Sequence, residues 1–155
     1  MEDVTIRAAT PDDAHDLTRV AHAAKRHWGY PDALIELWRN DLTLTAQFIR
    51  THPVYCAAAG SQILGFYALS RAQAAFELEH MWVDPPHMGR GVGRQLFQHA
   101  VDTVRALGGT SLTIAADPNA EAFYQRLGAR RVGAVPSQPP GRELPLLVIT
   151  VRGAR

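Results

Sequence analysis

The chain has 155 residues, and 16 Lys and Arg against 15 Asp and Glu leave a formal charge of +1, which excludes the broad positive surface typical of nucleic-acid-binding proteins. Apolar residues make up 46% and charged residues 20%, so disorder is excluded and we expect a single domain over residues 1–155. The one cysteine, Cys56, excludes an internal disulfide, and no metal-binding pattern of Cys or His is present, so we predict no metal.

The order of the predicted elements follows from the spacing of apolar residues and from turn residues. Alternating polarity predicts strands, apolar residues three and four apart predict helices, and Gly or Pro marks the ends. In chain order these rules predict a strand at 4–8, a helix at 14–28, a helix after Pro31 that buries Leu34, Ile35, Leu37 and Trp38, a helical turn at 46–50, strands at 54–59, 63–69 and 76–83 with a turn at 71–75, a helix at 91–107, a strand at 112–116, a helix at 118–127, and strands at 131–135 and 144–151. This order favours an α+β fold with helices on both faces of a mixed, mostly antiparallel sheet.

A glycine-rich segment, Met88-Gly89-Arg90-Gly91-Val92-Gly93, lies between a predicted strand and the long helix. Glycine permits positive φ and close backbone approach, and the first amides of a helix attract anions. Two nucleotide motifs are absent, because Arg94 replaces the third Rossmann glycine and no Walker Gly-Lys-Ser or Gly-Lys-Thr occurs. The segment therefore predicts a phosphate site built from backbone amides, with a plain tight turn as the alternative.

The run LEHMWVDPPHMGRGVGRQLF, followed by a helix, a strand and DPNAEAFYQRLGA, resembles the GNAT superfamily of N-acetyltransferases. The resemblance covers residues 77–130, and residues 1–76 agree with it in layout only. It implies a GNAT-like sheet of about six to seven strands and acetyl-CoA as the cofactor. It also implies transfer of the acetyl group to a primary amine by direct attack in a ternary complex.

The cofactor contacts implied by this resemblance lie at the end of a strand, in the glycine segment and near the last helix. They are Met81, Trp82, Val83, Met88, Gly89, Arg90, Gly91, Val92, Gly93, Arg94, Asp117, Asn119 and Tyr124. Met88 stands where the family has Gln or Arg, so Arg90 and Arg94 are the candidates to supply charge to a phosphate.

The catalytic candidates are Glu79 as general base and Tyr124 as general acid. Glu77 and Glu79 share one face of their strand, and the base prediction falls on Glu79, with Glu77 and His80 as alternatives. A purely structural alternative pairs Glu79 with an arginine such as Arg71. Tyr124 matches the family's acid position, and the alternative is a buried tyrosine without a catalytic role.

Acceptor recognition is assigned to Trp28, Tyr30 and Glu79, because aromatic rings and an acid hold a cationic amine by cation–π and charge contacts. The alternative is that the aromatic residues anchor two short helices to the sheet. The acceptor is a small-molecule amine or a peptide, and the sequence leaves its identity open.

The other functional classes rank lower. A non-catalytic acyl-CoA-binding sensor or scaffold is the main alternative, and nucleic-acid binding ranks third. The acidic start MEDVTIRAATPDD differs from a signal peptide and no apolar run is long enough for a membrane helix, so we expect a cytoplasmic protein without membrane contact. The apolar segment 144–151 is a candidate exposed edge strand, which suggests a homodimer as a hypothesis.

Overall fold

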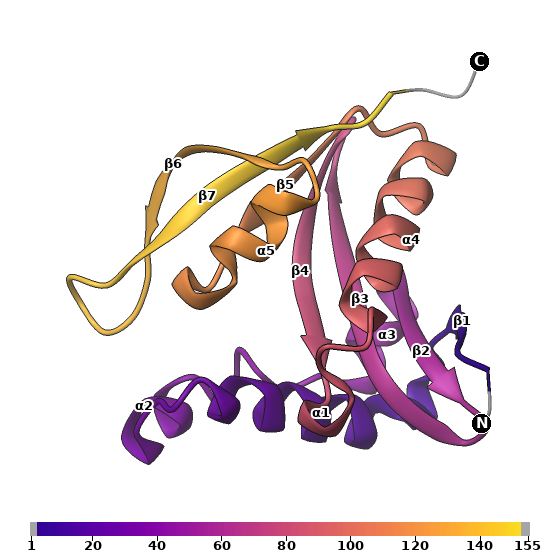
Figure 1. The fold of residues 1–155 in the computed structure, drawn as a ribbon, viewed down its shortest axis with the longest axis horizontal. Helices are drawn as coiled ribbons and strands as arrows, with labels where there is room; N and C mark the ends of the chain where they lie inside the picture. Colours follow the sequence, from indigo (N-terminus) through magenta and orange to yellow (C-terminus); the bar gives the residue numbers. More distant parts are fainter. Residues whose placement is uncertain (1–2, 153–155) are drawn as a thin grey trace. The chain divides into compact units, whose positions relative to one another are not determined.

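The computed structural model describes residues 3–152 (Figure 1). Its seven strands run in the order β1-β2-β3-β4-β5-β7-β6, with parallel and antiparallel neighbours, which confirms the predicted α+β fold with a mixed sheet. The described chain divides into two compact units. The first unit comprises residues 3–69 and 80–99, and the second comprises residues 70–79 and 100–152.

The elements follow the predicted order closely. The strands are β1 Thr5–Ala8, β2 Val54–Ala59, β3 Gln62–Ala72, β4 Ala75–Val83, β5 Ser111–Ala115, β6 Arg130–Pro136 and β7 Glu143–Thr150. The α-helices are α1 Ala14–His27, α2 Asp32–Leu37, α3 Ala46–Thr51, α4 Val92–Ala106 and α5 Glu121–Arg126, and short 3-10 helices lie at Pro11–Asp13, Pro85–His87 and Pro118–Ala120.

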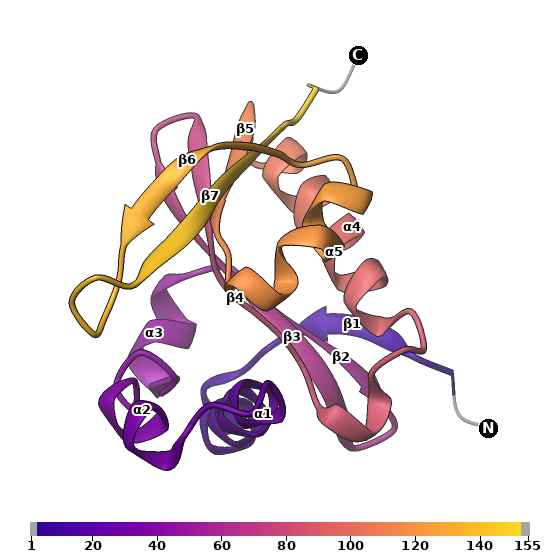
Figure 2. The same ribbon diagram turned by 60° about the vertical axis from the view of Figure 1, so that its left-hand side comes forward.

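In the first unit, β1, β2 and β3 form antiparallel pairs, and α1, α2 and α3 lie on one side of these strands (Figure 2). Helix α1 buries residues spaced three and four apart, such as Leu17, Val20 and Ala24. They belong to a core that includes Cys56 of β2 and Phe66 of β3. One face of the strands is therefore sealed by the helices of the first third of the chain.

The start of α4 packs on the other face of the same strands. Tyr67 is fully buried, and its hydroxyl lies 2.7 Å from Nδ1 of His99 on α4. The ring of Tyr55 stacks on Tyr67, with centroids 5.6 Å apart, and lies 4.8 Å from His99. Within the first unit, helices thus cover both faces of the strands, as expected.

In the second unit, the first half of β4 runs parallel to β5, with Phe76 opposite Leu112. Strand β7 is antiparallel to β5 on one side and to β6 on the other. The prediction that 144–151 is an exposed edge strand is therefore wrong, because both edges of β7 are paired. The strand at the edge is β6, which is largely exposed and carries an irregularity between Arg131 and Gly133.

Two local predictions need correction. Leu37 is 52% exposed rather than buried, because it follows the buried Ile35 by two residues and so lies on the opposite side of α2. The turn predicted at 71–75 is shorter, since β3 continues to Ala72 and β4 begins at Ala75. Gln73 makes this tight turn with a φ of 59°.

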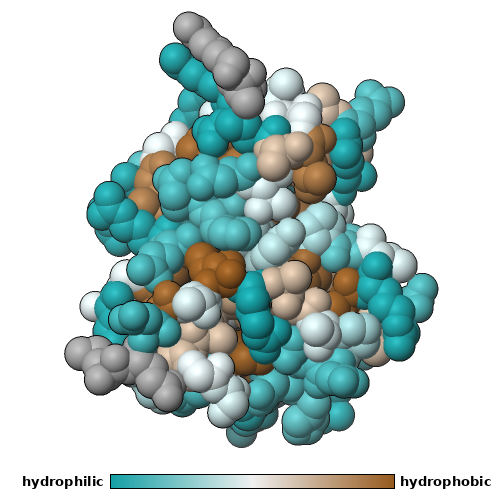
Figure 3. Space-filling model, turned by 90° about the vertical axis from the view of Figure 1, so that its right-hand side faces the viewer, coloured by the Kyte–Doolittle hydropathy of each residue, from teal (hydrophilic) through white to brown (hydrophobic). Residues whose placement is uncertain are grey.

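Hydrophobic side chains reach the surface at scattered points. The large ones that are exposed come from different elements and are Val4, Trp28, Leu37, Leu107 and Val132. Figure 3 shows one face on which hydrophobic patches are separated by hydrophilic side chains. Among residues 3–152, no helix has the length and apolar character needed to cross a bilayer.

Candidate active site

The glycine segment forms an open turn between β4 and α4 in the first unit. Gly89 and Gly91 have φ values of 77° and 83°, in the left-handed region that favours glycine, and a Cβ at either position would meet no atom within 4 Å. The segment from Gly89 to Gly91 is exposed. Because α4 begins at Val92, its first backbone amides lack partners within the helix. This turn can therefore receive an anion.

A buried aspartate fixes the chain just before this turn. Asp84 is 6% exposed, its backbone N–H donates to the Leu64 carbonyl at 2.8 Å, and its own carbonyl accepts from His87 N–H at 2.8 Å. Its carboxylate accepts from Nη1 of Arg19 on α1 at 3.3 Å. Sequence reasoning missed the contact between Arg19 and Asp84, because Asp84 before two prolines signals a helix start but nothing local indicates Arg19.

The end of β4 approaches β3 closely. Met81, Trp82 and Val83 are half-buried, and a Cβ at Gly65 of β3 would lie 2.7 Å from the Trp82 carbonyl oxygen and 3.2 Å from Val83 Cα. Only glycine allows this separation, since real Cβ contacts essentially never fall below 3.0 Å. The three predicted cofactor residues of β4 therefore sit on a backbone whose position depends on Gly65.

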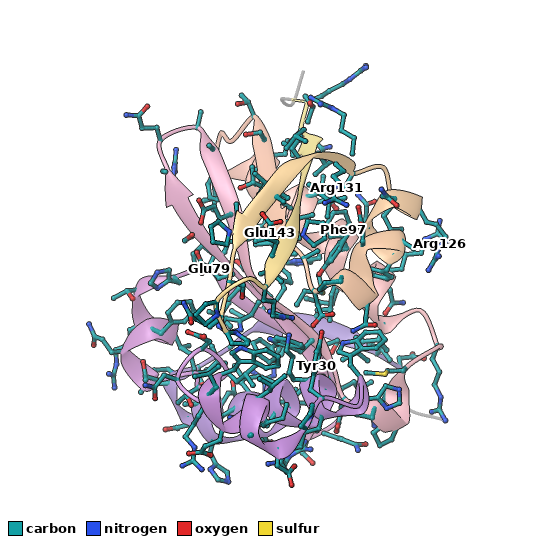
Figure 4. All side chains as sticks on the ribbon, turned by 90° about the vertical axis from the view of Figure 1, so that its left-hand side faces the viewer. Tyr30, Glu79, Phe97, Arg126, Arg131 and Glu143 are labelled. Atoms are coloured by element: carbon teal, nitrogen blue, oxygen red, sulfur yellow. The ribbon has the colours of Figure 1, made fainter. Side chains whose placement is uncertain are left out.

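A lysine lies among three aromatic rings on the side of α1 and α2. Nζ of Lys25 is 4.5 Å from the ring centroid of Trp38, 4.9 Å from that of Tyr30 and 5.9 Å from that of Trp82. Lys25 is only 7% exposed, and Figure 4 shows Tyr30 beside these helices. Two predicted site residues, Tyr30 and Trp82, thus meet around a lysine that sequence reasoning did not select. Trp28 is 40% exposed and contacts His27.

His80 has its Nδ1 atom engaged. The indole N–H of Trp82 donates to Nδ1 of His80 at 3.0 Å, and the rings of Phe48 and Phe66 lie beside the imidazole. An indole N–H only donates, so Nδ1 is unprotonated and the ring proton sits on Nε2 in this arrangement. A base role at Nδ1 of His80 would break the bond to Trp82.

In the second unit, Glu79 is exposed on β4 and accepts a hydrogen bond of 2.5 Å from Oγ of Ser70. Phe76 and Leu78 are buried while Glu77 and Glu79 are exposed, so the predicted face of the strand is correct. Arg71 donates to the Gln73 carbonyl instead of pairing with Glu79. Figure 4 labels Glu79 on β4.

Tyr124 of α5 is buried at 6% exposure. Burial raises the pKa of its phenol well above the ordinary value, and the negative charge of Asp117 raises it further, so the phenol is protonated at neutral pH. Asp117 accepts from the backbone and side-chain amides of Asn119, both at 2.9 Å, so it caps the short helix that begins at Pro118. Its other oxygen lies 3.7 Å from Nη2 of Arg142, a partner that sequence reasoning missed.

The predicted residues thus divide between the two units. The first unit holds Trp28, Tyr30, Met81, Trp82, Val83, Met88, Gly89, Arg90, Gly91, Val92, Gly93 and Arg94, and the second holds Glu79, Asp117, Asn119 and Tyr124. Within residues 3–152, no three His, Cys, Asp or Glu side chains are grouped as metal ligands. The first unit thus contributes an open glycine turn and an aromatic group around a lysine, and the second unit contributes an exposed carboxylate and a protonated phenol.

Comparisons with known proteins identify the family. A family model described as an acetyltransferase (GNAT) domain matches residues 31–138. The N-alpha-acetyltransferase RimI of Mycobacterium tuberculosis is 33% identical over 82 residues, which span 50% of this chain and 51% of that protein, about half the length of each.

Solved structures agree in fold. PaiA N-acetyltransferase of Thermoplasma acidophilum in complex with coenzyme A has a TM-score of 0.79 at 18% identity, covering 96% of this chain and 99% of that one. The ribosomal-protein-S18-alanine N-acetyltransferase of Escherichia coli has a TM-score of 0.73 at 16% identity, covering 99% of this chain and 97% of that one. Together with the family model, these similarities show that the chain belongs to the GNAT acetyltransferase family.

Proposed function

We propose that this chain is an acetyl-CoA-dependent N-acetyltransferase that acetylates a primary amine by direct attack in a ternary complex. The observation that carries the proposal is the open glycine turn at the start of α4, which follows the end of β4 after the short 3-10 helix Pro85–His87. The PaiA structure contains coenzyme A, which supports this choice of cofactor.

The glycine turn fits the diphosphate of the cofactor. Backbone amides from Gly89 to Arg94 would bind the phosphate oxygens, aided by the positive end of α4. Arg90 and Arg94 are exposed at this point and provide charge that Met88 lacks. The amides near Met81 and Val83 would polarise the acetyl carbonyl. Bound acetyl-CoA supplies the activated thioester for the transfer.

Proton removal from the acceptor is assigned to Glu79. A lysine-like amine has a pKa of ~10.4 and is protonated at neutral pH, so it must lose a proton before it attacks. Glu79 is exposed and ionisable, while His80 already uses Nδ1 to accept from Trp82. Glu79 therefore fits the base role better than His80, acting directly or through water, with Ser70 holding one carboxylate oxygen.

Tyr124 is assigned the opposite role, donation of a proton to the departing thiolate. A thiol has a pKa of ~8.5, below that of a phenol, so this transfer is uphill, and the phenol acts as a hydrogen-bond donor whose proton moves toward sulfur as the C–S bond breaks. The raised pKa of Tyr124 keeps this proton in place at neutral pH. Asp117 and Asn119 begin the short helix that leads to α5 and position its first turn.

The acceptor is a primary amine of a small molecule or a peptide. The M. tuberculosis protein is named an N-alpha-acetyltransferase and the E. coli protein a ribosomal-protein-S18-alanine N-acetyltransferase, which supports a peptide amine as one class to test. The exposed Trp28 is a candidate contact for such an acceptor. A non-catalytic acyl-CoA sensor or scaffold is the second hypothesis, and the missing charge at Met88 favours it.

The test combines cofactor binding with turnover. Acetyl-CoA should raise the melting temperature, and Gly91→Trp should remove that shift. Gly108→Trp is the matched control, because Gly108 also has a positive φ of 82° and open space, yet lies beyond the other end of α4. Release of thiol across a library of amines and peptides then measures transfer. Absence of any shift at millimolar acetyl-CoA would refute the cofactor assignment, and binding without turnover would favour the sensor.

A further inference from the structure

The group formed by Lys25 and its three rings, the Lys25 box, joins distant parts of the first unit. Lys25 comes from the last turn of α1, Tyr30 from the α1–α2 connection, Trp38 from the end of α2, and Trp82 from β4. The rings of Tyr30 and Trp38 are perpendicular, with centroids 4.9 Å apart. Several aromatic faces around one nitrogen are the arrangement by which proteins recognise ammonium groups.

Trp82 links the Lys25 box to the end of β4. The same indole donates to His80, and the Trp82 carbonyl is packed against Gly65. Lys25 therefore contacts a residue whose backbone belongs to the β4 segment assigned to the acetyl carbonyl. A substitution in the Lys25 box should therefore alter the position of the β4 segment through Trp82.

We propose that Tyr30, Trp38 and Trp82 form an alkylammonium-binding site whose resident ligand is the side chain of Lys25, and that Lys25 is a positioning residue for Trp82. The ligand class is a primary alkylammonium ion of about four carbons, the length of the lysine side chain. The three rings bind the cation, and the aliphatic stem packs beside them.

This site also bears on acceptor choice, a step that rests on the proposed function. While Lys25 fills the box, the second ammonium of a diamine acceptor finds these ring faces occupied. The protein should therefore prefer monoamines to diamines. Removal of Lys25 should make the box available and raise the ratio of diamine to monoamine kcat/KM on the order of tenfold, the size of a desolvated cation–π contact.

The primary test needs no catalytic activity. Lys25→Ala should lower the melting temperature, and n-butylammonium should restore roughly 2–4 °C in a saturable way. Equal concentrations of n-butanol test whether the charge is needed. Two controls should show no saturable shift in melting temperature. One is the wild type, whose box is filled by Lys25, and the other is Arg26→Ala, which removes an exposed cation from the same helix turn.

Each outcome decides the proposal. A saturable shift of Lys25→Ala with n-butylammonium alone supports it. The absence of that shift, an equal shift with n-butanol, or the same shift in Arg26→Ala would overturn it. Lys25→Met keeps the length of the side chain but removes its charge, so it is the variant to measure if Lys25→Ala does not fold. If Lys25→Met matches the wild type in melting temperature and in indole fluorescence measured on a Trp28→Phe background, Lys25 does not position Trp82. If n-butylammonium restores the melting temperature of Lys25→Ala but the protein acetylates no amine, the binding site is supported and only the proposed function is refuted.

Discussion

Gly65→Ala should impair transfer by moving the end of β4. The new Cβ would lie 2.7 Å from the Trp82 carbonyl oxygen, 3.1 Å from a Leu96 methyl and 3.2 Å from Val83 Cα. Two of these three neighbours are backbone atoms, which cannot rotate away as a side-chain end can. The strain must therefore be relieved by a shift of β4 relative to β3.

The size of the effect follows from these distances. An ordinary Cβ contact begins near 3.4 Å, so β4 must move by about 0.7 Å at Trp82. Misplacement of about 1 Å near reacting groups can lower turnover ~10²-fold, so we expect kcat to fall roughly ten- to a hundredfold. Overpacking of a strand interior also costs about 1–3 kcal/mol, which should lower the melting temperature by several degrees.

The assay must separate displacement from simple destabilisation. Gly109→Ala is the matched control, because its Cβ would meet the Phe76 ring and a Val104 methyl at 2.6 Å, which are side chains of the second unit. Steady-state kinetics and calorimetry are compared for both variants well below their melting temperatures. If the two variants lose stability alike and also lose kcat alike, the idea that Gly65 positions the β4 segment is refuted.

Three further predictions concern single groups. Tyr124→Phe should lower turnover ten- to a hundredfold with little change in acetyl-CoA KM, and unchanged turnover would remove the phenol from the mechanism. Burial raises the pKa of Cys56 to about 11, so at pH 8 its thiol should react with iodoacetamide only after unfolding, and rapid labelling of the folded protein would contradict this. For the same reason the free energy of unfolding should decline as the pH rises from about 9 towards 11. The hydrogen bond from Arg7 lowers the pKa of Asp13, so the pair stabilises the fold above pH ~4 and loses this effect as the pH falls through the lowered pKa. Thermal melts of Asp13→Asn should therefore show a weaker pH dependence between about pH 5 and 3 than the wild type, and identical curves would exclude the pair as a contributor.

The order of elements could be predicted because local patterns dominate it. The regular apolar spacing of α4 and the glycines at its two ends define that helix without any tertiary information. Leu37 shows where the approach fails. Its apolar character suggests burial, but which side of a six-residue helix meets the core depends on packing that the sequence does not display. The prediction that 144–151 lies at an edge of the sheet failed for the same reason, since the order of strands in a sheet depends on tertiary packing.

The candidate site divides in the same way. Its motif residues are neighbours in sequence, so the glycine turn and the β4 segment could be proposed together. Arg19 and Arg142 were missed because each meets its partner across a long stretch of chain. Lys25 lies near Tyr30 and Trp38 in sequence, but its contact with the distant Trp82 and its burial have no local signal. The cytoplasmic location, the homodimer, the single domain and the individual catalytic roles remain predictions.

The edge strand β6 has a consequence for self-association. Edge strands with free backbone groups invite addition of a further strand, as in amyloid growth. Here the irregular register between Arg131 and Gly133 interrupts a regular hydrogen-bonding edge, and the exposed Arg130 and Arg131 would bring like charges together if two copies met. Val132, at 49% exposure, is the one large apolar side chain exposed on this strand. The strand is thereby protected against uncontrolled polymerisation, and charge-removing substitutions at these arginines should be the changes that most endanger the solubility of this edge.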